Sequence, residues 1–182
     1  MITSELPSPF TFSQSSLQDY SDCPRRFQLR HIDHLAWPAV ETEPTQDYER
    51  HQQEGSLFHR MVQQYLIGLP AEKLAAQARS ESLSRWWEAY QQHAPVLDGY
   101  TLYPEYTLSA PLGAHRLVAK YDLIAIQPGK KVIIYDWKTY RKRPRDEYLA
   151  AHWQTRLYSV LLAQAGNHLN GGKPIVPEQI EM

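Results

Sequence analysis

Residues 133–147 read "IIYDWKTYRKRPRDE", an apolar run that continues into an aspartate, a lysine and a basic tail. In an extended strand, successive side chains point to opposite faces of the sheet. Asp136 and Lys138 therefore share one face, whereas Tyr135 and Trp137 share the other. The stretch predicts a buried strand that carries an acid and a base side by side.

The stretch "KYDLIAI", residues 120–126, predicts the neighbouring strand. A hairpin loop of three or five residues centred on Gly129 would place Asp122 directly across from Asp136, with β-carbons about 4.5–5.5 Å apart. Two like charges at this distance are destabilising unless a cation lies between them. Carboxylate oxygens favour Mg²⁺ or Mn²⁺, which points to a phosphate-ester substrate. The alternative is that Asp136 and Lys138 are solvated residues at the end of an edge strand, because such tripeptides are common.

The C-terminal half of the chain alternates strand patterns with turn signals. Residues 102–110, 114–126 and 131–139 are rich in β-branched and aromatic residues, and Pro-Gly turn signals separate them. We expect these three runs to form an antiparallel meander. Residues 147–165 carry a large apolar residue at every fourth position, which predicts a helix that covers the sheet.

The N-terminal half shows helical patterns. Residues 12–32 predict two short helices, residues 55–69 predict an amphipathic helix, and residues 71–93 predict a helical stretch that residues 80–84 could break. Residues 38–54 contain two prolines and no sustained apolar period. We expect this segment to be an exposed connection.

The composition indicates an ordinary globular domain in a reducing compartment. Of the 182 residues, 42% are hydrophobic and 21% are charged, and the formal net charge of −1 excludes a histone-like nucleic-acid coat. The single cysteine, Cys23, excludes an intramolecular disulfide framework. No apolar run approaches the roughly 20 residues of a membrane span. We therefore expect a cytoplasmic protein that does not enter a membrane.

The C-terminal residues 171–182, "GGKPIVPEQIEM", read as a loop followed by the first residues of another strand. We expect one domain over residues 1–182, truncated at its C-terminal end or lacking its last strand.

Five segments, taken in order, match a known pattern. Together they resemble the PD-(D/E)XK nuclease superfamily and, within it, the RecB-type branch that includes CRISPR-adaptation nucleases. The matching segments are "FSQSSLQDYSDCPRRFQL" (12–29), "GSLFH" (55–59), "KYDLIAI" (120–126), "YDWKT" (135–139) and "QTRLY" (154–158).

The resemblance implies an α/β (α+β) fold of the restriction-endonuclease type, with a central mixed sheet that contains the meander and is flanked by helices. It also implies that the chain hydrolyses DNA phosphodiester bonds with Mg²⁺ or Mn²⁺. By matching positions, His59, Asp122 and Asp136 would be metal ligands, together with the main-chain carbonyl of Trp137. Lys138 would be the catalytic lysine that orients the attacking water and offsets charge on the phosphate.

Each of four residues at matching positions has two possible interpretations. The resemblance places Gln154 and Tyr158 at the rim of the site, but they could equally form an internal hydrogen-bonded pair. Glu105 lies where some relatives carry an additional carboxylate, and its alternative is a solvated strand residue. A lone histidine such as His59 is more often a packed core residue, but Gly55, one turn earlier, would let the helix approach the sheet closely.

The basic tail suggests contacts with the nucleic-acid backbone. Arg141, Lys142 and Arg143 follow the proposed lysine and would bind phosphates, unless they belong to a solvated loop. A second contact region would contain Arg25, Arg26 and Arg30.

Some relatives hold an iron–sulfur cluster through four cysteines. Cys23 matches only the first, so no iron–sulfur cluster forms within this chain.

The full set of site residues favours an active exonuclease-like enzyme linked to DNA repair or recombination. Its partners would be DNA and a helicase or another repair subunit. The alternative is a catalytically inactive, nuclease-like module that binds DNA or serves as a scaffold for a helicase.

Overall fold

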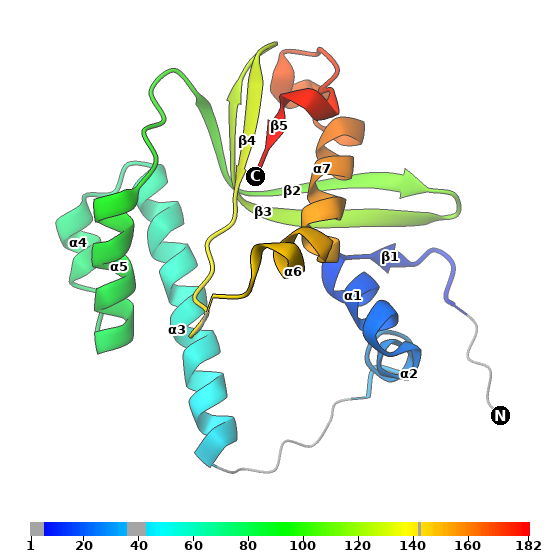
Figure 1. Ribbon diagram of the computed structural model, residues 1–182, viewed down its shortest axis with the longest axis horizontal. Coiled ribbons are helices and arrows are strands. Elements are labelled where there is room, and N and C mark those ends of the chain that lie inside the picture. The colour runs from blue at the N-terminus through cyan, green and yellow to red at the C-terminus, as the bar shows by residue number, and fades with distance from the viewer. Residues whose placement is uncertain (1–5, 36–42, 142) are drawn as a thin grey trace.

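A mixed sheet built around one long strand forms the centre of the computed structural model, which describes residues 6–35, 43–141 and 143–182 (Figure 1). Strand β3 (His115–Gln127) pairs antiparallel with β2 (Thr101–Leu112) and with β4 (Lys131–Tyr135), which confirms the predicted meander. Two short strands complete the sheet in parallel orientation, β1 (Thr11–Phe12) beside β3 and β5 (Ile180–Glu181) beside β4.

Strands β1 and β4 share one edge of β3, because β2 occupies the other edge along its length. β1 reaches only Arg116 and Leu117, whereas β4 pairs with residues 123–127. Between them, residues 118–122 have no strand partner on this edge within the described part of the chain. The hydroxyl of Tyr158 donates to the carbonyl of Lys120 at 2.6 Å in this interval. The sheet therefore opens next to Asp122.

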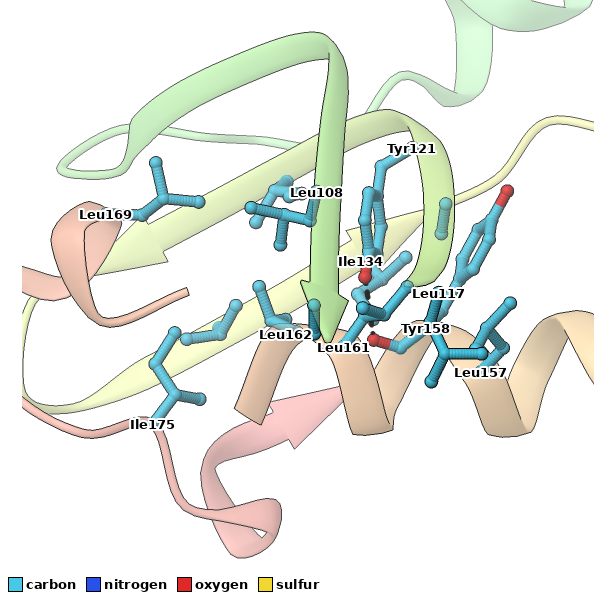
Figure 2. Close-up of a cluster of buried hydrophobic side chains, with 14 of the residues drawn as sticks. Leu108, Leu117, Tyr121, Ile134, Leu157, Tyr158, Leu161, Leu162, Leu169 and Ile175 are labelled. Atoms are coloured by element: carbon cyan, nitrogen blue, oxygen red, sulfur yellow. Dashed lines mark hydrogen bonds between the residues drawn. The ribbon is translucent and has the colours of Figure 1, made fainter. Parts of the chain in front are cut away.

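Helix α7 (Trp153–Ala165) packs across the sheet and completes the first hydrophobic core. Figure 2 shows its buried leucines facing the strands, and the Tyr121 hydroxyl donating to the carbonyl of Tyr158 at 2.8 Å. The single helix predicted over residues 147–165 is divided, since α6 (Asp146–Ala151) ends at His152, where the backbone is extended. The sequence pattern did not reveal this break, because the four-residue spacing of the apolar residues continues across the single non-helical residue.

Helices α3 (Glu43–Leu66), α4 (Ala71–Ala75) and α5 (Glu81–His93) form a second core and lie together on the left of Figure 1. Ser80 caps α5, so the predicted break in the helical stretch is present. Buried members of this core are Phe58, Met61, Val62, Leu74, Leu83, Trp87 and Tyr90.

The prediction that residues 38–54 form an exposed connection is wrong for residues 43–54. Residues 43–54 form the first half of α3, while residues 38–42 lie outside the described residues. Residues 46–50 are all exposed, so this part of the helix buries no apolar face. A search for apolar periodicity misses such a helix, because periodicity arises from burial.

The N-terminal segment contains helix α1 (Gln14–Asp22), helix α2 (Pro24–Phe27) and a π-helical turn η1 (Gln28–Ile32). Two 3-10 turns, η2 (Asn167–Asn170) and η3 (Pro177–Gln179), lead from α7 to β5. Among the described residues, no helix has the length and apolar character that crossing a membrane requires.

The carboxylate of Asp19 holds the N-terminal helices together. Its oxygens lie 2.8 Å from Arg26 Nε, 3.2 Å from Arg30 Nη1 and 2.9 Å from His31 Nε2. Burial alone would raise the pKa of Asp19, but hydrogen bonds from His31 and Arg30 and the charge of Arg26 outweigh it and lower the pKa. Arg26 and Arg30, expected in a second DNA-contact region, are thus bound to an internal carboxylate. Arg25 donates to Gln28 at 2.7 Å.

We expect Asp19→Asn to lower the free energy of unfolding by about 1–2 kcal/mol near neutral pH, because it removes charge-assisted hydrogen bonds to partly exposed partners. The folded-state pKa of Asp19 lies below its ordinary value of 3.8, so the ion pairs stabilise the fold above that value. Their contribution is lost as the pH falls through the folded-state pKa. Urea unfolding of both proteins, near neutral pH and at about pH 3, measures this difference.

Asp22→Asn is the matched control, because Asp22 pairs with the same Arg26 but is exposed. Equal stability of Asp19→Asn and wild type near neutral pH would contradict the assigned role of the carboxylate.

Candidate active site

A cleft of about 870 Å³ lies where α3, the sheet and α7 meet. Of the sequence-predicted residues, it brings together His59, Asp122, Asp136, Trp137, Lys138, Gln154 and Tyr158, and Glu105 lines it as well. These side chains come from segments that are far apart in the sequence, so the tertiary fold assembles the site.

Helix α3 brings His59 into the cleft. The Nδ1 atom of His59 lies 3.1 Å from Oδ1 of Asp122 on β3. One turn before it, a β-carbon at Gly55 would meet the hydroxyl oxygen of Thr139 at 3.0 Å, closer than ordinary packing allows. The sequence predicted a close approach of this helix to the sheet, but the approach that Gly55 permits is to the segment that follows β4. His51 Nε2, a further turn away, lies 2.7 Å from the carbonyl of Thr139 and fixes the same contact.

Glu105, Asp122 and His59 form a group that could hold a metal ion. Each contributes a ligand atom, and these atoms all lie within 4.8 Å of one another. Glu105 interrupts the β2 ladder, since Pro104 and Tyr106 pair with β3 and Glu105 does not. Its backbone has φ of 53°, which costs about 1–3 kcal/mol for a residue other than glycine and is typical of functional positions.

Burial and neighbouring charges shift the pKa of two residues in the cleft, His59 and Asp136. Burial lowers the pKa of His59, but the hydrogen bond and charge of Asp122, with Asp136 and Glu105, outweigh it and raise the pKa. Burial raises the pKa of Asp136, and Lys138 only partly offsets this. The carboxylates of Glu105 and Asp122 and the imidazole of His59 are a suitable donor set for a divalent cation.

The strand prediction around Asp136 needs one correction. β4 ends at Tyr135, so Asp136, Trp137 and Lys138 follow the strand instead of lying on it. The backbone N–H of Trp137 donates to Oδ2 of Asp122 at 2.8 Å, which turns the chain out of the ladder.

The predicted register is nevertheless present. Gln127 pairs with Lys131 around a three-residue loop centred on Gly129, and Leu123 pairs with Tyr135. The ladder therefore ends one residue short of the predicted pair of Asp122 and Asp136.

Asp136 and Lys138 form a second group beside the first. Lys138 Nζ lies 2.6 Å from Oδ2 of Asp136, and Gln154 Nε2 donates to Oδ1 of Asp136 at 2.6 Å. Gln154 Oε1 in turn accepts from Lys138 Nζ at 2.8 Å. Among the described residues, Asp136 therefore bonds to a lysine and an amide. It does not belong to the group formed by His59, Glu105 and Asp122.

Gln154 and Tyr158 form the internal hydrogen-bonded pair that was one of their two interpretations. Gln154 Nε2 lies 3.1 Å from the Tyr158 hydroxyl, so the two residues form an internal pair. Gln154 also positions Lys138 at the rim of the cleft. Tyr158 is buried, its pKa is raised chiefly by burial, and its hydroxyl is used to anchor β3.

The two described arginines of the basic tail, Arg141 and Arg143, do not line the cleft. Arg141 is exposed and lines a neighbouring hollow, and Arg143 pairs with Asp146 at 2.7 Å. Lys142 lies outside the described residues.

The sequence did not point to two further residues that take part in the site. Lys120 forms an ion pair with Glu105, and His51 fixes Thr139. His51, Gly55 and His59 stand at four-residue spacing on one helical face, a usable signal had residues 43–54 been recognised as helix.

The comparisons with known proteins agree with this architecture. A family model described as the PD-(D/E)XK nuclease superfamily matches residues 11–180. No curated protein matches the chain. The curled mixed sheet flanked by helices is the restriction-endonuclease-like fold of this superfamily, whose nucleases generally use divalent metal ions. The chain therefore belongs to the PD-(D/E)XK nuclease superfamily.

Proposed function

We propose that this chain is a Mg²⁺- or Mn²⁺-dependent deoxyribonuclease, exonuclease-like in action and linked to DNA repair or recombination. The observation that carries the proposal is one cleft that holds a His59–Glu105–Asp122 group beside an Asp136–Lys138–Gln154 group. The RecB-type branch is the part of the superfamily that its sequence motifs favour.

Four side chains and one main-chain carbonyl would hold the metal ion. His59, Glu105 and Asp122 offer one ligand atom each, and the motif adds Asp136 and the carbonyl of Trp137. The ion would stabilise negative oxygens of the reacting phosphate and make water a better nucleophile. Glu105 would be a ligand here, and its strained backbone supports that role.

Lys138 would act on the reacting groups. Its side chain is 34% exposed, and Asp136 and Gln154 hold its amino group at the edge of the cleft. In hydrolysis, a water oxygen bonds to phosphorus and the bond from phosphorus to the leaving sugar oxygen breaks. A fixed ammonium group beside the phosphate would orient the water and offset the charge that develops.

A second candidate function is an inactive module that binds DNA or a helicase partner. The ion pairs of Lys120 with Glu105 and of Lys138 with Asp136 favour it, because they neutralise the carboxylates without a metal ion. This candidate predicts DNA binding without cleavage when Mn²⁺ is present.

We expect the purified protein to cleave end-labelled DNA in the presence of Mn²⁺ and to lose this activity in EDTA. Lys138→Ala should lower the cleavage rate about 10²–10³-fold, because it removes an electrostatic contact to the transition state. Lys73→Ala removes an exposed lysine on α4 and should cleave like wild type. Gel electrophoresis of the products measures all three proteins, and cleavage that persists in EDTA or in Lys138→Ala would rule out the assigned chemistry.

We also expect Asp122→Asn to lower the affinity for Mn²⁺ about 100-fold, and Glu105→Gln about tenfold, since each removes a ligand charge. Isothermal titration calorimetry without DNA measures this affinity independently of cleavage. Asp98→Asn, an exposed residue after α5, is the matched control. Unchanged Mn²⁺ affinity in Asp122→Asn would show that the metal lies elsewhere.

A further inference from the structure

A hollow of about 340 Å³, rich in aromatic side chains, lies next to the cleft. Trp137, Lys138 and Thr139 line both the hollow and the cleft, so the two spaces meet along this segment. Its other walls come from α3 and α5 and include Phe58, Trp86, Tyr90 and His93. None of the roles described above uses this space.

The aromatic walls are held in fixed orientations. Trp137 stacks on Tyr135 with ring centroids 6.1 Å apart, and Tyr90 meets it edge-on at 5.7 Å. Trp86 packs edge-on against Phe58 at 6.1 Å. Phe58 and Tyr90 are buried, whereas the two tryptophans remain half-buried. Ordinary core packing explains the buried pair, but it leaves indole surface facing the hollow.

The chemistry of this hollow fits a flat aromatic ligand that carries negative charge. Its volume lies in the range of small-ligand pockets, about 300–1,000 Å³. Exposed indole rings stack on nucleobases of any sequence. Lys138 and His93 at the same hollow place polar groups beside the aromatic surface, where a nucleotide has its phosphate.

A third hollow extends the same surface. It has a volume of about 630 Å³ and contains Arg50, Arg85 and Arg141, and Trp86 lines both this hollow and the aromatic one. Arg50 pairs with Asp47, whereas Arg85 and Arg141 form no ion pair among the described residues. Guanidinium groups beside an aromatic ring are the usual means of binding a single-stranded backbone.

We propose that the aromatic hollow is a binding subsite for one unpaired nucleobase, so that the substrate strand is single-stranded where it enters the cleft. The inference rests on the proposed nuclease function and specifies its substrate class. A base paired in a duplex would first have to leave its stack, which disfavours duplex substrates at this position.

The test is binding in EDTA, where cleavage does not interfere. Fluorescence anisotropy would measure the Kd of three labelled probes: an oligothymidine of about 12 nucleotides, the same strand with abasic sites, and its blunt duplex. We expect wild type to bind the oligothymidine about tenfold more tightly than either other probe, because base stacking contributes about this factor. Trp86→Leu should lose this preference and bind the first two probes alike.

Tyr65→Leu is the matched control. Tyr65 contacts Trp87 and Tyr90 in the same aromatic cluster but does not line the hollow. This variant should keep the wild-type preference, and the melting temperatures of both variants report on folding. If Trp86→Leu does not fold, the comparison of the normal and abasic strands on wild type still decides the question.

Equal affinity of wild type for normal and abasic strands, or for strand and duplex, overturns the subsite. Cleavage of DNA with Mn²⁺ alongside that result leaves the nuclease function standing without the subsite. Base-dependent binding that Trp86→Leu abolishes supports the subsite, even where no Mn²⁺-dependent cleavage occurs.

Discussion

The carboxylate of Asp122 joins helix α3 to the segment that follows β4. One oxygen lies 3.1 Å from His59 of α3, and the other accepts the backbone N–H of Trp137 at 2.8 Å. A single half-buried side chain on β3 thus connects the helical core to the segment that leaves the sheet after β4. Loss of these hydrogen bonds would leave polar groups unpaired at the junction of the two cores, so the geometry of the cleft depends on this residue.

Ion pairs hold the other two carboxylates of the cleft, those of Asp136 and Glu105, in place. Asp136 is half-buried and bonds to both Lys138 and Gln154, while Glu105 bonds to the more exposed Lys120. Each acid next to Asp122 therefore has a cationic neighbour. Such pairing fixes the positions of these carboxylates before any ligand arrives.

Much of this arrangement could be predicted because it follows from local rules. The three-residue loop centred on Gly129 fixes the register of β3 and β4 as far as the pair Leu123 and Tyr135. Gly55 indicated a close helix approach, and the structure shows one. These inferences need only the period of a strand or helix and the geometry of a turn.

The rest depends on contacts that no local pattern records. The positive φ of Glu105 belongs to a residue that rarely adopts it, so propensity gave no indication that the side chain would join His59 and Asp122. The exposed half of α3 has no apolar stripe, and for that reason His51 was not recognised as part of the site. In both cases tertiary contacts decide the local structure.

Trp137 connects the chemistry of the cleft to the aromatic hollow. Its backbone N–H orients Asp122, and its side chain packs against the helical core and lines the hollow next to Lys138. One residue therefore contributes both to the orientation of Asp122 and to the wall of the hollow. A large aromatic side chain suits this position because it packs against the helical core while its backbone N–H bonds to Asp122.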